Sequence, residues 1–311
     1  MEVETSIRAG EVLSDIEPLL DALHQVVLEE APHLRRLFEI FAQEARVARA
    51  WLVPGLSRVR TGDQILEVGA GLMLLSCQLA REGYAVVALE PISEGFSQFS
   101  ELQGIVLRYA REQGIAPEVL TIPVEDLAVE GAFAFAFSFN VMEHVKSPSL
   151  AIRNVCKAIR PGGEYRFSCP NYHFPYEPHF NIPTFFSKKL TEFFLASFIF
   201  GSKKMADPAG VWRSLNWINV TRVTHETRLI PDISVSFDRK VFRVALERAI
   251  NDEEFAARRA RWVRVLAKGM VSLGLHRMTE HLPPHVHPII DCTIVRGLGA
   301  GNEQRSAILD P

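Results

Sequence analysis

The sequence predicts an α/β fold built on a mostly parallel sheet, and three observations near residue 65 support this prediction. Ile65, Leu66 and Val68 form a short apolar run, as expected of a parallel strand that is buried on both faces. A glycine-rich turn follows, and residues 72–82 then have the apolar spacing of an amphipathic helix. A second apolar run, Ala85–Leu89, completes a strand–helix–strand unit, the repeating element of parallel sheets.

The turn after the first strand has the features of a cofactor-binding turn. Gly69 and Gly71 have no Cβ atom, so they can adopt positive φ and let a ligand approach the backbone closely. A dinucleotide turn of the Gly-x-Gly-x-x-Gly type needs a third glycine, and this chain has Leu74 there. Glu67 would repel a pyrophosphate but could receive the ammonium group of an amino-acid ligand. The alternative interpretation is a strand-to-helix turn that merely needs glycine.

A second acidic residue, Glu90, ends the second strand and is followed by Pro91. In a strand–helix–strand unit this position lies beside the first turn, where a carboxylate can accept hydrogen bonds from two ribose hydroxyls. The alternative for Glu90 is a solvated acid at a strand end.

These residues resemble the cofactor-binding pattern of class I S-adenosylmethionine-dependent methyltransferases, of the small-molecule type related to ubiquinone-pathway O-methyltransferases. The resemblance covers residues 62–170. It implies that Glu67, Gly69, Ala70 and Gly71 hold the methionine part of the cofactor, and that the second acid and the proline after it lie at the ribose. It also implies a Rossmann-like sheet of seven mostly parallel strands with an antiparallel last strand, together with N-terminal helices and helical lid insertions.

Two further segments match the family pattern. Residues 121–127 resemble the segment after the third strand, which implies that Glu125 or Asp126 contacts the adenine. The fourth strand, expected at residues 135–139, leads into a stretch that resembles the family's N-x-x-E-H-V motif, so Asn140 and Val141 are expected below the methyl-donor sulfur. Residues 159–163 resemble the turn from a helix into the fifth strand.

The rest of the chain divides around this core. Helices are expected at about 11–29 and 33–53, the second ended by Pro54, and the sixth and seventh strands at 233–237 and 292–295. One or two helices are expected between these two strands. The domain prediction is a helical cap over 1–60, the cofactor-binding core over 61–170, a lid and acceptor-binding insertion over 171–230, closing strands with a helical insertion over 231–298, and a tail over 299–311.

The segment after the fifth strand is the predicted acceptor-binding wall. Ligands of open α/β sheets bind at the carboxyl ends of the strands, and residues 171–183 begin there and are rich in rings, prolines and amides. A surface loop is the alternative. His173, Glu177 and His179 could also be interpreted as metal ligands, but their spacing is irregular, and no metal is expected. The acceptor-binding residues proposed are Tyr172, His173, Tyr176, His179 and Phe180.

Methyl transfer to a hydroxyl group requires removal of the hydroxyl proton, a task that suits histidine near neutral pH. His144 follows the fourth strand and is one candidate base, and His173 and His179 of the predicted wall are the others. The alternative for His144 is a residue that only orients the turn formed with Glu143.

Residues 185–200 contain six phenylalanines and read as a helix. The segment is too short to span a bilayer, which needs about 20 apolar residues. It could pack on the domain as a lid, rest on a membrane surface as a peripheral contact, or line an apolar acceptor site. A partly apolar small-molecule acceptor is therefore expected.

Composition agrees with a globular enzyme. The 311 residues carry 34 basic and 37 acidic side chains, and the net charge of −3 argues against nucleic-acid binding. Four cysteines are widely spaced, so buried thiols are expected, and residues 1–10 lack an export signal, so a cytoplasmic protein is expected. A homodimer is a further option. The sequence favours an S-adenosylmethionine-dependent O-methyltransferase, with a nicotinamide-dependent dehydrogenase or a non-catalytic S-adenosylmethionine-binding protein as alternatives.

Overall fold

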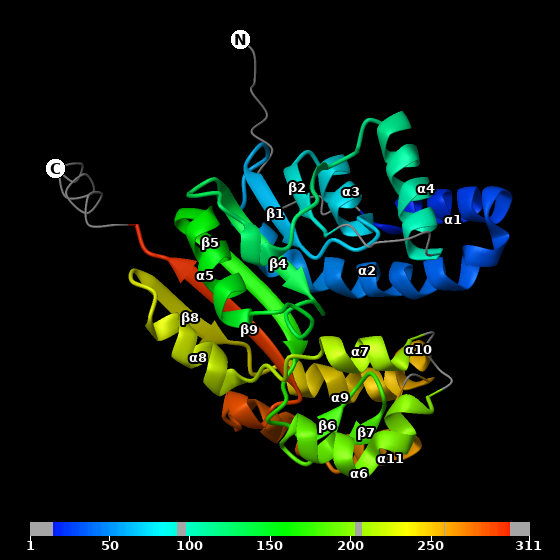
Figure 1. Cartoon of the computed structure of the whole chain (residues 1–311), viewed down its shortest axis with the longest axis vertical. Helices are drawn as coiled ribbons and strands as arrows, with labels where there is room; N and C mark the ends of the chain where they lie inside the picture. The colour runs from blue at the N-terminus through cyan, green and yellow to red at the C-terminus, as the bar shows by residue number, and fades with distance from the viewer. Residues whose placement is uncertain (1–14, 92–97, 203–206, 258, 299–311) are drawn as a thin grey trace. The chain divides into compact units, whose positions relative to one another are not determined.

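The structure is a computed structural model that describes residues 15–91, 98–202, 207–257 and 259–298 (Figure 1). The chain divides into two compact units. The first unit contains residues 1–138 and 157–165, and the second contains residues 139–156 and 166–311. The predicted domain boundaries differ from this division, and they stay a prediction.

Seven strands form one sheet in the order β3-β2-β1-β4-β5-β9-β8. Strand β1 pairs in parallel with β2 and β4, β2 pairs in parallel with β3, and β8 pairs antiparallel with β9. The predicted fold, a seven-stranded and mostly parallel sheet with an antiparallel last strand, is thereby confirmed. The strands are β1 Gln64–Val68, β2 Ala85–Leu89, β3 Glu118–Leu120, β4 Phe133–Phe139, β5 Ile159–Pro170, β8 Ile233–Phe237 and β9 Ile289–Arg296.

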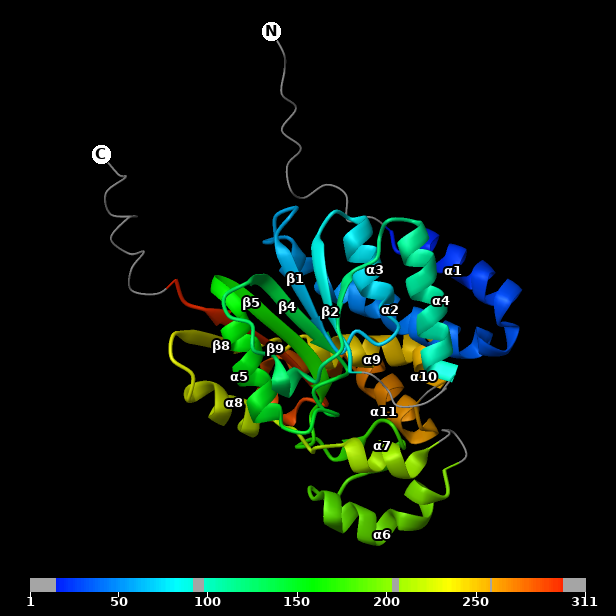
Figure 2. The same cartoon turned by 45° about the horizontal axis from the view of Figure 1, so that its top comes forward.

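The helices of the first unit pack on one another and on β2. Helices α1 and α2 pack together, α1 contacts α4, and α3 lies between α2 and β2 (Figures 1 and 2). The apolar stripes of α1 and α2 supply much of this core, which includes the fully buried Leu23 and Leu52. The elements are α1 Glu17–Glu30, η1 Pro32–Leu34, α2 Arg35–Leu56, α3 Leu74–Arg81, α4 Gln98–Glu112 and η2 Val124–Asp126.

The predicted end of the second helix at Val53 is wrong, because α2 continues through Pro54 to Leu56. A proline inside a helix removes one hydrogen bond and crowds the carbonyl four residues earlier, so this continuation has an energetic cost. Burial of Leu56, which is 1% exposed, and of Gly55 against the sheet favours the additional turn. Residues 11–14, the predicted start of the first helix, lie outside the described residues.

Gly55 provides a test of this packing. A Cβ atom at Gly55 would lie 2.6 Å from Cζ of Phe135, whereas a Cβ atom at Gly104 of α4 would meet nothing within 4 Å. We expect Gly55→Ala to destabilise the protein by about 1–3 kcal/mol through overpacking. Gly104→Ala, the matched control in a helix, should stabilise it by about 0.5–1 kcal/mol. Urea unfolding measures both, and equal changes would contradict the packing of α2 on β4.

The second unit contains the remaining helices and a short hairpin, β6 Tyr176–Glu177 with β7 Ile182–Pro183. The hairpin lies within residues 171–183, the predicted acceptor-binding wall. In the described residues between β8 and β9, which leave out residue 258, the structure has three α-helices and not the one or two predicted. The helices are α5 Pro148–Ala158, α6 Lys188–Phe200, α7 Pro208–Ser214, α8 Val220–Arg228, α9 Val241–Asn251, α10 Glu253–Ala257 and α11 Arg261–Ser272, with short turns η3 Leu275–His281 and η4 Pro284–Val286.

The predicted turn at residues 159–163 is part of β5, which begins at Ile159. Gly162 has a φ of +77°, and a Cβ atom at Gly163 would lie 3.0 Å from the carbonyl oxygen of Ala134. These glycines let the start of the strand lie close to the backbone of β4. Farther along β5, Arg166 forms a buried bidentate ion pair with Asp291 of β9, with N···O distances of 3.1 and 2.8 Å.

All four cysteines are buried and unbridged, as the sequence predicts. They are Cys77, Cys156, Cys169 and Cys292. Among the residues that the structure describes, none of the helices has both the length and the hydropathy needed to cross a membrane.

Candidate active site

The glycine turn after β1 has the conformation that the sequence predicts. Gly69 and Gly71 have φ values of +72° and +54°. The amides of Gly69 and Ala70 donate to the carbonyl of Leu89, at 2.8 and 3.2 Å, so the turn is attached to the end of β2. The predicted helix start at residue 72 is two residues early, because α3 begins at Leu74.

Glu90 lies beside this turn. Its Oε2 atom accepts a hydrogen bond of 2.8 Å from the amide of Gly71, and the Gly71 carbonyl accepts one of 2.8 Å from Gln103 Nε2. Burial raises the pKa of the Glu90 carboxyl, and the hydrogen bond from Gly71 partly offsets this effect. The structure thus brings together the glycine turn and the acid that the sequence predicts for the methionine and ribose parts of the cofactor. The roles of these residues stay predictions.

Glu67 is buried within β1 and accepts a hydrogen bond from the Ser76 hydroxyl. Burial raises the pKa of this carboxyl to about 8, and the nearby Glu90 carboxylate adds to the increase. Without a ligand, Glu67 is therefore largely protonated at neutral pH. An ammonium group close to it would favour the ionised form.

This pKa predicts how stability depends on pH. Because the pKa of Glu67 is higher in the folded state, its contribution to stability is present below pH 4.5 and decreases as the pH rises toward 8. Glu67→Gln has no carboxyl group that can ionise, so we expect this variant to lack the part of the decrease in stability that Glu67 causes. Thermal unfolding without ligand, measured across that pH range, should give a flatter curve for Glu67→Gln than for wild type or for the exposed control Glu118→Gln. Parallel curves would contradict the assignment.

Other predicted cofactor-binding residues lie at strand ends. Glu125 is half-buried and Asp126 is exposed, and both belong to η2, which follows β3. Asn140 has a φ of +57°, and its amide donates to the carbonyl of Ser168 at 2.8 Å. Val141 is half-buried. Their contacts with a cofactor stay predictions, as does that of Pro91.

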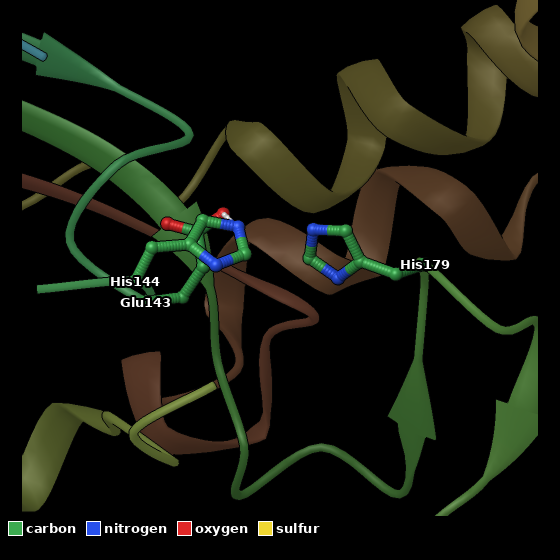
Figure 3. A group of neighbouring side chains, drawn as sticks. All are labelled: Glu143, His144 and His179. Carbon is green, nitrogen blue, oxygen red and sulfur yellow. Dashed lines mark ion pairs between the residues drawn. The ribbon is translucent and has the colours of Figure 1, made fainter. Parts of the chain in front are cut away.

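The second unit brings Glu143, His144 and His179 together (Figure 3). One ligand atom from each of these side chains lies within 4.8 Å of the others. The Nε2 atom of His144 is 3.9 Å from Oε1 of Glu143, and the two imidazole rings meet edge to face with centroids 5.1 Å apart. Glu143 is fully buried, whereas the two histidine side chains are about one-third and one-quarter exposed. We call these three residues the histidine cluster.

His179 is held by a buried carboxylate. Its Nδ1 atom is 2.6 Å from Oε1 of Glu177, whose other oxygen accepts the amide of Phe180 at 2.7 Å. The hydroxyl of Tyr172 also donates to Glu177, at 3.3 Å. Since a carboxylate accepts hydrogen bonds, Nδ1 carries a proton in this pair, and Nε2 is an acceptor whenever the ring is neutral.

The His144 ring also has its Nδ1 atom bound to a protein oxygen. Its Nδ1 atom is 2.8 Å from the Ser214 hydroxyl, which itself donates to the carbonyl of Val211 at 2.8 Å. The Ser214 oxygen therefore accepts from Nδ1–H, and Nε2 of His144 is the acceptor. Burial lowers the pKa of His144 to about 4, with a further decrease from His179 and a partial increase from Glu177, so the ring is neutral near pH 7.

His173, the third candidate base, is not in the cluster. Burial and the neighbouring His285 lower its pKa. The other residues of the predicted wall make packing contacts. Tyr172 stacks on Trp217 with centroids 4.3 Å apart, the Tyr176 hydroxyl donates to Asn181 at 2.6 Å, and Phe180 packs on Trp212. Their binding of an acceptor stays a prediction.

Glu177 and Ser214 have no site role predicted from the sequence. Glu177 was considered only as a metal ligand, and its pairing with His179 depends on the two-residue spacing at the end of β6. Ser214 is 70 residues from His144 along the chain. No local pattern indicates such a contact.

A family model described as a methyltransferase domain matches residues 33–222 of this chain, which is more than half of its length. The chain belongs to the methyltransferase-domain family. The resemblance drawn from residues 62–170 is thereby confirmed, and the protein is a class I methyltransferase that uses S-adenosylmethionine. The dehydrogenase alternative is set aside.

Relatives extend beyond the cofactor-binding region. An uncharacterised protein of Mycobacterium tuberculosis is 46% identical over 266 residues, which is 86% of this methyltransferase and 90% of that protein. The ubiquinone biosynthesis O-methyltransferase of Agrobacterium fabrum is 32% identical over 111 residues, 35% of this chain and 42% of that enzyme. The geranyl diphosphate C-methyltransferase of Streptomyces coelicolor has a TM-score of 0.49 and 11% identity, over 85% of this chain and 83% of that one.

Proposed function

We propose that this methyltransferase transfers the methyl group of S-adenosylmethionine to the oxygen of a small, partly apolar acceptor. The observation that carries this proposal is the histidine cluster, in which two imidazole rings present Nε2 acceptor atoms beside a buried carboxylate. The ubiquinone biosynthesis O-methyltransferases, which match about one-third of the chain, support oxygen as the acceptor atom.

A hydroxyl group is a weak nucleophile until its proton is removed. Nε2 of His179 can take that proton, and Glu177 stabilises the resulting imidazolium through the hydrogen bond at Nδ1. The acceptor oxygen then forms a bond to the methyl carbon, the bond between this carbon and the sulfonium sulfur breaks, and S-adenosylhomocysteine leaves. The products are the methyl ether, S-adenosylhomocysteine and one proton.

The proposed cofactor-binding residues have distinct tasks. Glu90 accepts hydrogen bonds from the ribose hydroxyls, the turn at Gly69 and Gly71 lets the methionine part approach the backbone, and Glu67 balances its ammonium group. Glu125 or Asp126 contacts the adenine. The burial of Glu67 and Glu90 supports these assignments, because the ammonium group and the ribose hydroxyls of a ligand would offset the cost of keeping the two carboxylates ionised.

An apolar acceptor or membrane contact is supported by helix α6 and the residues just before it. The six phenylalanines of residues 185–200 are 42–78% exposed, which is unusual for such large apolar side chains. Only Thr191 and Ile199 of this helix are buried. We propose that the exposed side binds a lipid surface from which the acceptor is taken. These exposed phenylalanines are Phe185, Phe186, Phe193, Phe194, Phe198 and Phe200.

Vesicle binding tests the role of α6. Burial of a phenylalanine side chain contributes about 1.5–3 kcal/mol, so Phe193→Ser combined with Phe194→Ser should weaken binding to phosphatidylcholine–phosphatidylglycerol vesicles by about two to four orders of magnitude. Leu229→Ser, which removes another exposed apolar side chain, is the control and should bind as wild type does. Co-sedimentation measures this. If the wild-type protein did not bind the vesicles, the membrane proposal would be contradicted. If it formed a dimer and did not bind vesicles, α6 would be assigned to a subunit interface.

The choice of oxygen is tested with matched acceptors. Aryl and alkyl compounds that differ only in carrying a hydroxyl or an amine are incubated with labelled S-adenosylmethionine, and the products are identified by mass spectrometry. We expect methylated hydroxyl compounds, with catalytic efficiency that rises with the length of the apolar part. Exclusive methylation of the amines, or of carbon, would refute oxygen as the acceptor atom.

A further inference from the structure

We propose that Glu143, His144 and His179 bind a divalent transition-metal ion, such as zinc. From the sequence no metal is expected, and His173, Glu177 and His179 are the ligand set considered. The histidine cluster differs from that set, because two of its three members come from the turn after β4. Metal binding is a property beyond the proposed methyl transfer, and it can be measured without cofactor or acceptor.

The first argument is the orientation of the two imidazole rings. Both rings have Nδ1 bound to a protein oxygen, Glu177 Oε1 at 2.6 Å and Ser214 Oγ at 2.8 Å. Histidine ligands of metals are typically held in this way, with one ring nitrogen donating to a carboxylate or another oxygen while the other nitrogen binds the metal. The partners of Nδ1 fix the tautomer in which Nε2 has a lone pair.

The second argument is the chemistry of the groups that meet. The rings of His144 and His179 face one another with the Glu143 carboxylate beside them (Figure 3). All three present acceptor atoms, within 4.8 Å of one another. Two imidazole nitrogens and one carboxylate form a ligand set that zinc enzymes use for catalysis, with a fourth position open.

The third argument is that the cluster is supported by its surroundings. The side-chain amide of Asn216 donates to the carbonyls of Met142 and Val145, at 2.7 and 2.8 Å. The backbone amide of Asn216 donates to the carbonyl of Glu143 at 2.8 Å. The turn that carries Glu143 and His144 is therefore fixed. The hairpin β6–β7 fixes His179 through Glu177. Ligands that are already in position lose less entropy when a metal binds.

A metal at this position would act on the acceptor of the proposed reaction. A hydroxyl group bound at the open position loses its proton more readily, because the cation stabilises the resulting alkoxide. Metal and proton would then compete for the same two Nε2 atoms, so the metal could replace His179 as the group that activates the hydroxyl.

The test uses untagged full-length protein that has been freed of metal with a chelator. Co2+, which gives visible absorption bands when bound by nitrogen and oxygen ligands in low coordination, is titrated as the spectroscopic probe, and Zn2+ is used to displace it. We expect one Co2+ per chain in wild type, and loss of these bands in His179→Ala and in Glu143→Gln. Glu177→Gln should retain the site with metal affinity lowered about 10–100-fold.

His173→Ala is the matched control, since this histidine belongs to the same segment but not to the cluster, and it should bind Co2+ as wild type does. Circular dichroism checks that each variant is folded, and His179→Gln replaces His179→Ala if the latter unfolds. The absence of Co2+ bands in wild type, or bands that persist in the cluster variants, would refute the metal site. A different result would refute the proposed methyl transfer: metal-loaded protein that binds no S-adenosylmethionine. That result would leave the metal site standing.

Discussion

Glu90→Ala should lower the affinity for S-adenosylmethionine by about two to four orders of magnitude. Two ribose hydrogen bonds to a charged acceptor would be lost, and each is worth about 1.5–3 kcal/mol. The variant also removes the acceptor of the Gly71 amide, which holds the glycine turn against the end of β2. Titration calorimetry with S-adenosylmethionine and with S-adenosylhomocysteine measures the effect.

Two further variants separate binding from folding in this experiment. Glu118→Ala removes an exposed glutamate at the start of β3 and should leave cofactor affinity unchanged. Glu90→Gln keeps an acceptor oxygen without the charge and should give an intermediate affinity. If Glu90→Ala bound the cofactor as tightly as wild type, the ribose assignment would be wrong.

His179→Asn should lower kcat by about 100–10,000-fold, because general base catalysis typically contributes that factor. Cofactor affinity should change little, since the residues proposed to bind the cofactor do not include His179. Initial rates at saturating S-adenosylmethionine, together with calorimetry, measure the two quantities. Equal losses of kcat and of cofactor affinity would show that His179 has only a structural role.

Glu177 provides a second test of the same assignment. Glu177→Gln keeps the shape of the side chain but cannot stabilise an imidazolium, so we expect a smaller kcat and an altered pH–rate profile, with the acceptor KM nearly unchanged. Folding must be checked, because Glu177 also accepts the amide of Phe180. A pH–rate profile identical to that of wild type would exclude a role for Glu177 in orienting the base.

The cofactor-binding half of the fold could be predicted because its signals are local. The apolar run of β1, the glycines of the turn and Glu90 lie within 26 residues, and the backbone pairing of β1 with β2 follows from this short connection. Strand β9 was also predicted, although its neighbour β8 is more than 50 residues away, because alternating apolar residues mark both strands.

The histidine cluster could be predicted only in part. His144 and His179 were candidates because histidine suits proton transfer, but the sequence ranked them equally with His173. Tertiary contacts distinguish these two histidines from His173. Nδ1 of His144 pairs with Ser214, and Nδ1 of His179 pairs with Glu177. Similarly, the helical continuation through Pro54 depends on packing, which overrides the local tendency of proline to end a helix.

Methyl transfer from S-adenosylmethionine to oxygen can be tested by following a labelled methyl group. The protein is incubated with S-adenosylmethionine that carries an isotopic label in its methyl group and with apolar hydroxyl acceptors, and both products are quantified by mass spectrometry. We expect the labelled methyl group on the acceptor oxygen, in a one-to-one ratio with S-adenosylhomocysteine, and neither product with His179→Asn. Cofactor that binds but remains unconsumed with every acceptor would contradict the claim and indicate a binding protein.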